Sequence, residues 1–152
     1  MTPITFQHRR FVARKAGEIA AEIADLSRWP EFDGYGPLPG ITSAAYEEFG
    51  GAMTGARIRV QNDDGSSHLE TVEVWQPPER IVMRLHEFTP PLSRLASHFV
   101  EEWRFDAADG GSEVTRQLQL YPRSPLARPA LWFISLLMRC AIARHLEKIA
   151  GQ

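Results

Sequence analysis

The central part of the chain is divided into short strand-forming runs by closely spaced turn signals. Six such runs occur between residues 41 and 121, separated mostly by pairs or triplets of glycine, proline and aspartate. Most of the links are short, whereas a parallel pair of strands needs a crossover of about a dozen residues or more. The sequence therefore predicts six consecutive antiparallel strands, which we expect at residues 41–48, 55–61, 68–75, 80–88, 99–105 and 113–121.

The segments on either side of this region have other periodicities. Residues 4–12 follow a period of two, which is typical of a strand. Apolar residues recur at helical spacing over residues 16–26, and we expect Pro30 to end that helix because proline cannot continue it. Residues 126–149 predict a longer helix with a wide apolar face, and a helix of that size spans about 36 Å.

The predicted order is thus strand, helix, six strands and a long helix, which defines an α+β fold. An antiparallel sheet needs cover on one face, and the last helix is long enough to provide it. We expect a curved antiparallel sheet wrapped around that helix, with an internal cavity where the two do not fill the volume between them. Since no linker, repeat or low-complexity tract interrupts the 152 residues, we expect one domain over residues 1–152.

Several classes of site and location are disfavoured. Cys140 is the single cysteine, so an intrachain disulfide and a cysteine-based metal cluster are excluded. The histidines lack metal-ligand spacing and no phosphate-binding glycine loop is present, so we predict no metal and no cofactor. The first 14 residues contain no apolar run of signal-peptide length, and residues 129–138 are too short to span a bilayer. We therefore expect a cytoplasmic protein.

Charge is distributed unevenly along the chain. The net charge of −2 offers no global field to attract nucleic acid, which we do not expect as a partner. Residues 122–152 carry five basic groups and one acidic group, whereas residues 1–121 have a net charge of −6. A basic helix on an acidic body is the simpler interpretation, and peripheral contact with a membrane surface is the alternative. The oligomeric state stays open.

Four short sequence motifs occur in a characteristic order along nearly the whole chain. They are residues 24–32 (ADLSRWPEF), 55–57 (GAR), 70–80 (ETVEVWQPPER) and 110–115 (GGSEVT). With the closing helix, they resemble the START/SRPBCC superfamily and, within it, the polyketide cyclase/dehydrase-like proteins. The resemblance implies a helix-grip fold whose hydrophobic cavity binds a lipid, quinone, polyketide or other apolar molecule. Catalysis varies among such proteins, so the fold does not settle the function.

Two neighbouring predicted strands place charged residues on apolar faces. Alternate residues of a strand share a face, so Arg116 lies beside Leu118, and Glu101 lies between Phe99 and Trp103. The turn at residues 109–111 places Trp103 opposite Arg116 and Glu101 diagonally from it. A buried charge needs a partner because burying it alone costs several kcal/mol.

This arrangement has two interpretations. We favour a structural pair of Arg116 with Glu101, in which Trp103 stacks on the guanidinium. In the alternative, Arg116 holds a ligand carboxylate or polarises a carbonyl, and Glu101 orients it. A register shift of one residue would reverse both faces.

Glu70 is a further candidate, because His68, Val72 and Val74 are expected on the same strand face. If Glu70 points inward, it could act as a general base. We favour the simpler interpretation that Glu70 lies near the end of its strand and is solvated.

Aromatic residues at the helix break and in the last helix are expected to line or cap the cavity, because ligand sites are mostly apolar with few polar groups. The predicted ligand-binding residues are Trp29, Phe32, Glu70, Phe99, Glu101, Trp103, Arg116, Leu118, Trp132 and Phe133.

We predict a module that binds a small hydrophobic or amphipathic ligand, such as a lipid, quinone or polyketide-like compound, with Arg116 and Glu101 as its polar anchor. One alternative is an enzyme of cyclase or dehydratase type, in which Glu70 or Glu101 acts as an acid or base and Arg116 stabilises an enolate. It ranks lower because the sequence shows no compelling acid–base pair. Another alternative is a co-chaperone-like or membrane-surface protein.

Overall fold

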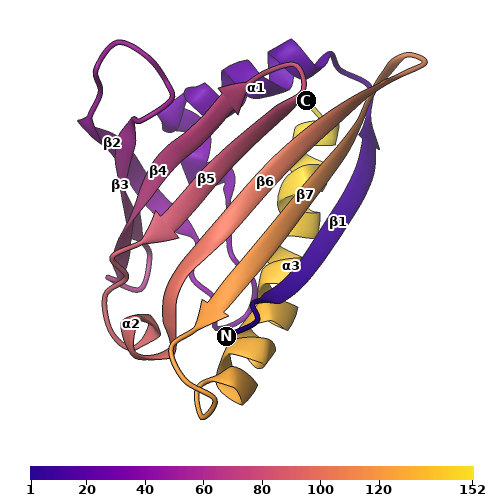
Figure 1. Ribbon diagram of the computed structural model, residues 1–152. Coiled ribbons are helices and arrows are strands. Elements are labelled where there is room, and N and C mark those ends of the chain that lie inside the picture. The colour runs from indigo at the N-terminus through magenta and orange to yellow at the C-terminus, as the bar shows by residue number, and fades with distance from the viewer.

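The computed structural model describes residues 1–152, in which seven strands form one antiparallel sheet that curves around a long C-terminal helix (Figure 1). Strands β2 to β7 are neighbours in sequence order, and β1 pairs with β7 at the other edge. This confirms the predicted antiparallel order and the curved sheet. The strands are β1 (Ile4–Val12), β2 (Ile41–Glu48), β3 (Arg57–Asn62), β4 (Ser67–Gln76), β5 (Arg80–His86), β6 (Ala96–Ala108) and β7 (Gly111–Pro122).

Three helices and one 3-10 segment complete the chain. The long helix α3 (Arg128–Ala150) lies across the concave face of the sheet. Helix α1 (Ala16–Ala24) lies beside the C-terminal turn of α3, whereas the short α2 (Leu92–Leu95) lies near the N-terminal turns of α3 (Figure 1). We call these the α1 end and the α2 end of the molecule. No helix has the length and apolar character needed to cross a bilayer.

The first helix ends earlier than expected. It stops at Ala24, and Pro30 lies inside the 3-10 segment η1 (Leu26–Glu31) instead of ending α1. Asp25 accounts for the break, because its carboxylate accepts hydrogen bonds from the backbone N–H and the hydroxyl of Ser27, at 3.1 and 2.6 Å. This cap starts η1 and competes with continuation of α1. Helix α2 lies between the strands expected at residues 80–88 and 99–105, where no helix was expected.

A β-bulge corrects the predicted facing of the end of β4. Val72 lies opposite Met83 of β5, but Val74 lies opposite Val82, so one extra residue is inserted between them. An inserted residue reverses the facing of all that follows. Val74 therefore does not share a face with Glu70, and Trp75 packs against the core instead.

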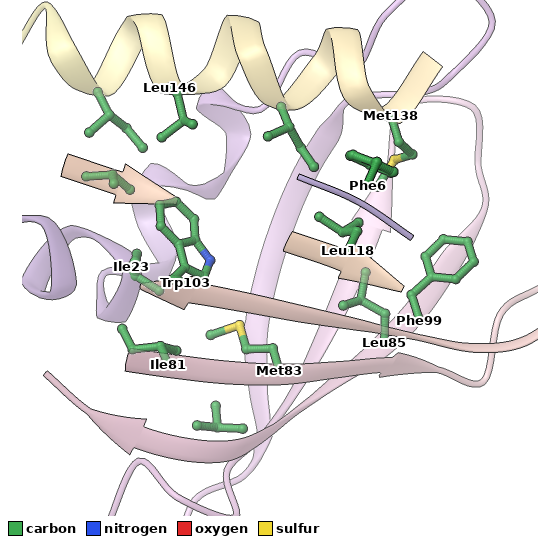
Figure 2. Packing of buried hydrophobic residues seen from close by; sticks show 14 of the residues in the cluster. Phe6, Ile23, Ile81, Met83, Leu85, Phe99, Trp103, Leu118, Met138 and Leu146 are labelled. Carbon is green, nitrogen blue, oxygen red and sulfur yellow. The ribbon is translucent and has the colours of Figure 1, made fainter. Parts of the chain in front are cut away.

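The core lies between the sheet and the inner face of α3 (Figure 2). In α3, Leu131, Met138, Ile142 and Leu146 recur at spacings of seven, four and four, which places them on one helix face. They meet inward-facing strand residues such as Leu118, and all five are buried. The apolar face predicted for the last helix is therefore the face that packs against the sheet.

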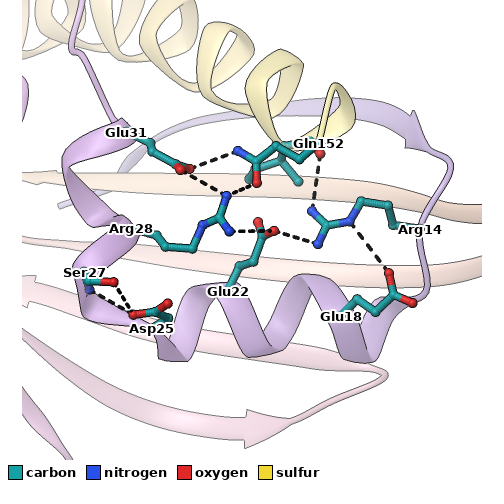
Figure 3. Close-up of polar contacts among 9 residues, drawn as sticks. Arg14, Glu18, Glu22, Asp25, Ser27, Arg28, Glu31 and Gln152 are labelled. Carbon is teal, nitrogen blue, oxygen red and sulfur yellow. Dashed lines mark hydrogen bonds and ion pairs between the residues drawn. The ribbon is translucent and has the colours of Figure 1, made fainter.

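Ionic contacts hold the C-terminal turn of α3 at the α1 end (Figure 3). Glu22 of α1 accepts from Arg14 at 2.6 Å and lies 3.5 Å from Arg28 of η1. Arg14 also donates to the backbone carbonyl of Ile149 at 3.4 Å, and Gln152 bonds to Arg28. These contacts join α1, η1 and α3, so this end of the molecule is tied together by polar side chains.

The turn between β6 and β7 packs closely against the chain that leaves β1. A Cβ atom on Gly111 would lie 2.1 Å from the carbonyl oxygen of Val12 and 2.8 Å from the Cα of Ala13. Because both are backbone atoms, we expect Gly111→Ala to lower the free energy of unfolding by about 2 kcal/mol or more. Urea denaturation checks this.

Gly17→Ala is the matched control for that substitution. A Cβ atom at Gly17 meets nothing within 4 Å, and alanine favours the helix. We expect this variant to be as stable as the wild type or more so. An unchanged urea midpoint for Gly111→Ala would contradict the close packing of the turn.

Candidate functional site

A cavity of about 430 Å³ lies between the concave face of the sheet and α3. Helix α3 packs against β1 and β7, while the remaining strands curve away from it (Figure 1). Of the 35 lining residues, 19 are hydrophobic. This size and lining are typical of sites for small molecules. The expected internal cavity is therefore present, and its lining combines hydrophobic residues with charged ones.

The lining contains every predicted ligand-binding residue except Trp132. Trp132 is exposed to solvent, because it lies on the outer face of α3 with Leu136, which follows it by four residues. Phe133 lines the cavity and is itself partly exposed, so the cavity reaches the surface there. That the lining residues bind a ligand stays a prediction.

The sheet presents its inward side chains in cross-strand rows. In one row, Trp103 of β6 lies opposite Arg116 of β7, as predicted. In the next row toward the α2 end, Glu101 lies opposite Leu118. In the row after that, Leu85 of β5 lies between Glu70 of β4 and Phe99 of β6. The charged residues that the strands contribute to the cavity therefore occupy two separate places, one around Arg116 and one around Glu70.

Arg116 and Glu101 form a buried ion pair. The Nη2 and Nε atoms of Arg116 donate to one carboxylate oxygen of Glu101 at 2.6 and 3.2 Å. The indole N–H of Trp103 donates to the other oxygen at 3.3 Å, and the guanidinium carbon lies 4.0 Å from the centre of the Trp103 ring. Arg116 is only 4% exposed. The pair that the strand register predicted is therefore present, with the stacked tryptophan.

His145 of α3 completes this group, and the sequence analysis missed it. Its Nδ1 atom lies 2.9 Å from Nη1 of Arg116, and Phe32 packs edge-on against its ring. Since arginine can only donate, Nδ1 is the acceptor. Desolvation, followed by the positive charges of Arg116 and Lys148, lowers the pKa of His145 to about 3, so the ring is neutral. Its spacing of three residues from Ile142 could have placed it on the inner helix face.

Arg116 keeps unused hydrogen-bonding capacity. A guanidinium has five N–H groups, and the contacts with Glu101 and His145 use three of them. One N–H therefore remains on each Nη atom. Because Arg116 lines the cavity and Trp103 covers one face of the guanidinium, an oxygen atom of a bound molecule is the natural acceptor for them.

His68 and Glu70 form the second polar group, on β4. Their Nε2 and Oε2 atoms lie 3.0 Å apart and both residues line the cavity. Glu70 is 6% exposed, so the favoured expectation of a solvated Glu70 is wrong. The chain that follows β5 covers this part of the strand, and Phe88 packs against the His68 ring at 5.8 Å between ring centres.

The neutral state of His145 makes the stability of the protein depend on pH. Because its pKa lies near 3 in the folded protein and near 6.5 when unperturbed, the unfolded chain binds the extra proton first. We expect the free energy of unfolding to fall as the pH drops from 6.5 toward 3, and to gain nothing from this group above 6.5.

The matched variant for this effect is His145→Asn, whose side-chain oxygen can still accept from Arg116 but does not titrate. Urea denaturation at several pH values should show a smaller loss of stability on acidification than in the wild type. Identical pH profiles would contradict a neutral, buried His145.

The comparisons with known proteins agree with this architecture. The family model described as "Polyketide cyclase / dehydrase and lipid transport" matches residues 3–151, whereas no curated protein matches the chain in sequence. The solved structure of the Zhui aromatase/cyclase from Streptomyces sp. R1128 is 15% identical, with a TM-score of 0.73 over 98% of this chain and 92% of that one.

Two further structures are similar over almost their whole length. A START superfamily protein from Mycobacterium smegmatis is 14% identical, with a TM-score of 0.73 over 97% of both chains. The structure of Ara h 8.0201 is 15% identical, with a TM-score of 0.71 over 99% of both chains. These identities show a shared helix-grip fold alone. The family model, by contrast, spans nearly all the strands and the helix that enclose the cavity, so the chain belongs to the polyketide cyclase/dehydrase and lipid transport family.

Proposed function

We propose that the cavity binds a small, uncharged apolar molecule that carries a carbonyl oxygen. The observation that carries this proposal is the Arg116 guanidinium, which lines a largely hydrophobic cavity of about 430 Å³ with two N–H groups not used within the protein. In such a cavity, the apolar lining supplies most of the binding energy, and the few polar groups fix the orientation of the ligand. Quinones and polyketide-like ketones have this chemistry.

The charges around the cavity favour a carbonyl over a carboxylate. Glu101 already balances the charge of Arg116, and His145 is neutral. Glu70 adds a further buried carboxyl group to the same cavity. A ligand carboxylate would therefore bring an uncompensated negative charge into a desolvated space, which is costly. A carbonyl oxygen accepts the free N–H groups without adding charge.

Two ligands that differ only in their carbonyl groups test the anchor. Menadione and 2-methylnaphthalene share a methylated bicyclic skeleton, so calorimetric titration with each compares oxygen recognition at nearly constant shape. We expect the wild type to prefer menadione. In the variant that combines Arg116→Met with Glu101→Gln, we expect the affinity for menadione to fall about tenfold, and the affinity for 2-methylnaphthalene to stay within about twofold.

The double variant serves a purpose that a single substitution cannot. Arg116→Met alone leaves the Glu101 carboxylate buried without its partner, which destabilises the fold, whereas removing both charges is often neutral. A thermal melt of each variant separates lost folding from lost binding. Equal losses of affinity for the two ligands, or none for menadione, would overturn the proposed anchor.

A second candidate function, an enzyme of the cyclase or dehydratase type, is favoured by the contact of His68 with Glu70. A carboxylate only accepts hydrogen bonds, so the Nε2–H group of His68 is the donor and Glu70 is the acceptor. The Nδ1 atom is then left as a base, and Glu70 would stabilise the imidazolium that forms when it takes a proton. Such a pair can remove a proton from the carbon beside a carbonyl group, leaving an enolate. This function ranks second because Arg116 lies two rows away along the sheet.

Deuterium exchange at the carbon beside a ketone tests that chemistry. With 2-tetralone in D2O, we expect the wild type to exchange the α-hydrogens faster than buffer alone, as followed by proton NMR. His68→Asn should lower this enhancement about 100-fold, since general bases contribute factors of that order. His98→Asn is the control, because His98 is a half-buried histidine outside the cavity lining. An exchange rate equal to that of buffer, or unaffected by His68→Asn, would leave the pair a structural contact.

A further inference from the structure

An exposed apolar patch lies at the α2 end of the molecule. Leu126 is 93% exposed, Trp132 56%, Phe133 54% and Leu136 38%. These four large side chains lie within one segment, residues 126–136, and we call them the apolar patch. Contiguous exposed apolar surface with a charged rim marks a site of interaction with a protein or a membrane.

The apolar patch is continuous with the cavity. Trp132 and Leu136 are four residues apart, so they share the solvent face of α3. Phe133 lies next to them and also lines the cavity, and Leu92 and Leu95 of α2 line it as well. The patch therefore extends from the outer face of the helix to the place where the cavity reaches the surface.

Arginines surround the apolar patch. Arg128 precedes Trp132 by four residues and Arg139 follows Leu136 by three, so both lie on the same helix face. Arg123 joins this region to α2 by donating to the carbonyl of Ser93, and Arg94 of α2 is exposed.

Acidic residues are absent from these segments. The sequence has none between Glu113 and Glu147, and none between Glu87 and Glu101. Asp64, which also lines the cavity, belongs to the turn between β3 and β4. The border formed by α2 and α3 therefore carries positive charge without a neighbouring carboxylate in the same segment.

We propose that the apolar patch and its arginines dock this protein on the surface of a bilayer that contains anionic phospholipid. Trp132, Phe133 and Leu136 enter the boundary between headgroups and acyl chains, while Arg128 and Arg139 contact the phosphates. Aromatic and aliphatic side chains flanked by arginine are the groups that such interfaces favour.

Two features favour a bilayer over a protein partner. The apolar patch protrudes on the solvent-facing side of α3, and the arginines around it are all positively charged. Such a surface suits a broad anionic bilayer more than a shaped pocket on a protein. The cavity opens beside it, and a bilayer is an apolar phase from which an apolar molecule can enter. Docking itself requires no occupied cavity, so the proposed ligand and the proposed surface can fail separately.

Flotation of the full chain with vesicles tests the proposal, without any added ligand. We expect binding to vesicles of phosphatidylcholine with phosphatidylglycerol, and much weaker binding to phosphatidylcholine alone or at high salt. Trp132→Ala combined with Leu136→Ala should weaken binding about tenfold. Arg128→Gln combined with Arg139→Gln should weaken binding to the anionic vesicles about 25-fold, at about fivefold per arginine.

Substitutions elsewhere provide the matched controls. Phe49 is half-exposed between β2 and β3, and Arg84 is exposed on β5, both outside the patch. Phe49→Ala and Arg84→Gln should bind like the wild type. Trp132→Phe should also bind, but it should lose most of the fluorescence quenching that brominated lipid causes, because the other three tryptophans are buried or half-buried.

Three results would overturn the proposal. The first is a wild type with no preference for anionic vesicles, and the second is an equal loss of vesicle binding in the patch and control variants. The third is a protein that does not bind vesicles but forms a dimer, which the Trp132→Ala and Leu136→Ala substitutions dissociate. The last result would assign the patch to a second copy of the chain. A thermal melt of each variant checks that it remains folded.

Discussion

The buried ion pair between Arg116 and Glu101 is the interaction on which the arrangement of the protein interior depends. Two charges removed from water cost several kcal/mol each unless their geometry is close and their remaining hydrogen-bonding groups find partners. Here Glu101 takes two bonds from Arg116 and one from Trp103, and His145 accepts a further bond. The register of β6 with β7, the position of α3 and the neutrality of the imidazole are thus parts of one arrangement.

The cavity has a simple origin in the packing of one helix on a curved sheet. Helix α3 contacts β1 and β7 closely, so the strands beyond β6 curve away and leave space on their inner side. The ion pair stands at the boundary between these two regions. It can therefore satisfy its own charges and still offer two N–H groups to the space beside it, which a pair inside the packed core could not do.

The two ends of the molecule differ in their chemistry. At the α1 end, Arg14, Glu22 and Arg28 tie the C-terminal turn of α3 to α1 and η1 (Figure 3). At the α2 end, the apolar patch and its arginines lie beside the place where the cavity reaches the surface. This asymmetry supports entry of an apolar ligand at the α2 end, and it joins the proposed cavity function to the proposed membrane surface.

The sequence by itself determined the order of the elements, the antiparallel sheet and the pairing of Arg116 with Glu101. These features depend on short links and on the local register of a hairpin, which the turn between β6 and β7 sets. Only the tertiary structure decided that Glu70 is buried beside His68, that His145 reaches Arg116 and that Trp132 faces solvent. A covering loop, a β-bulge and the rotation of α3 about its axis control these positions. Each of them results from packing between segments distant in the chain, which periodicity along one strand or helix does not record.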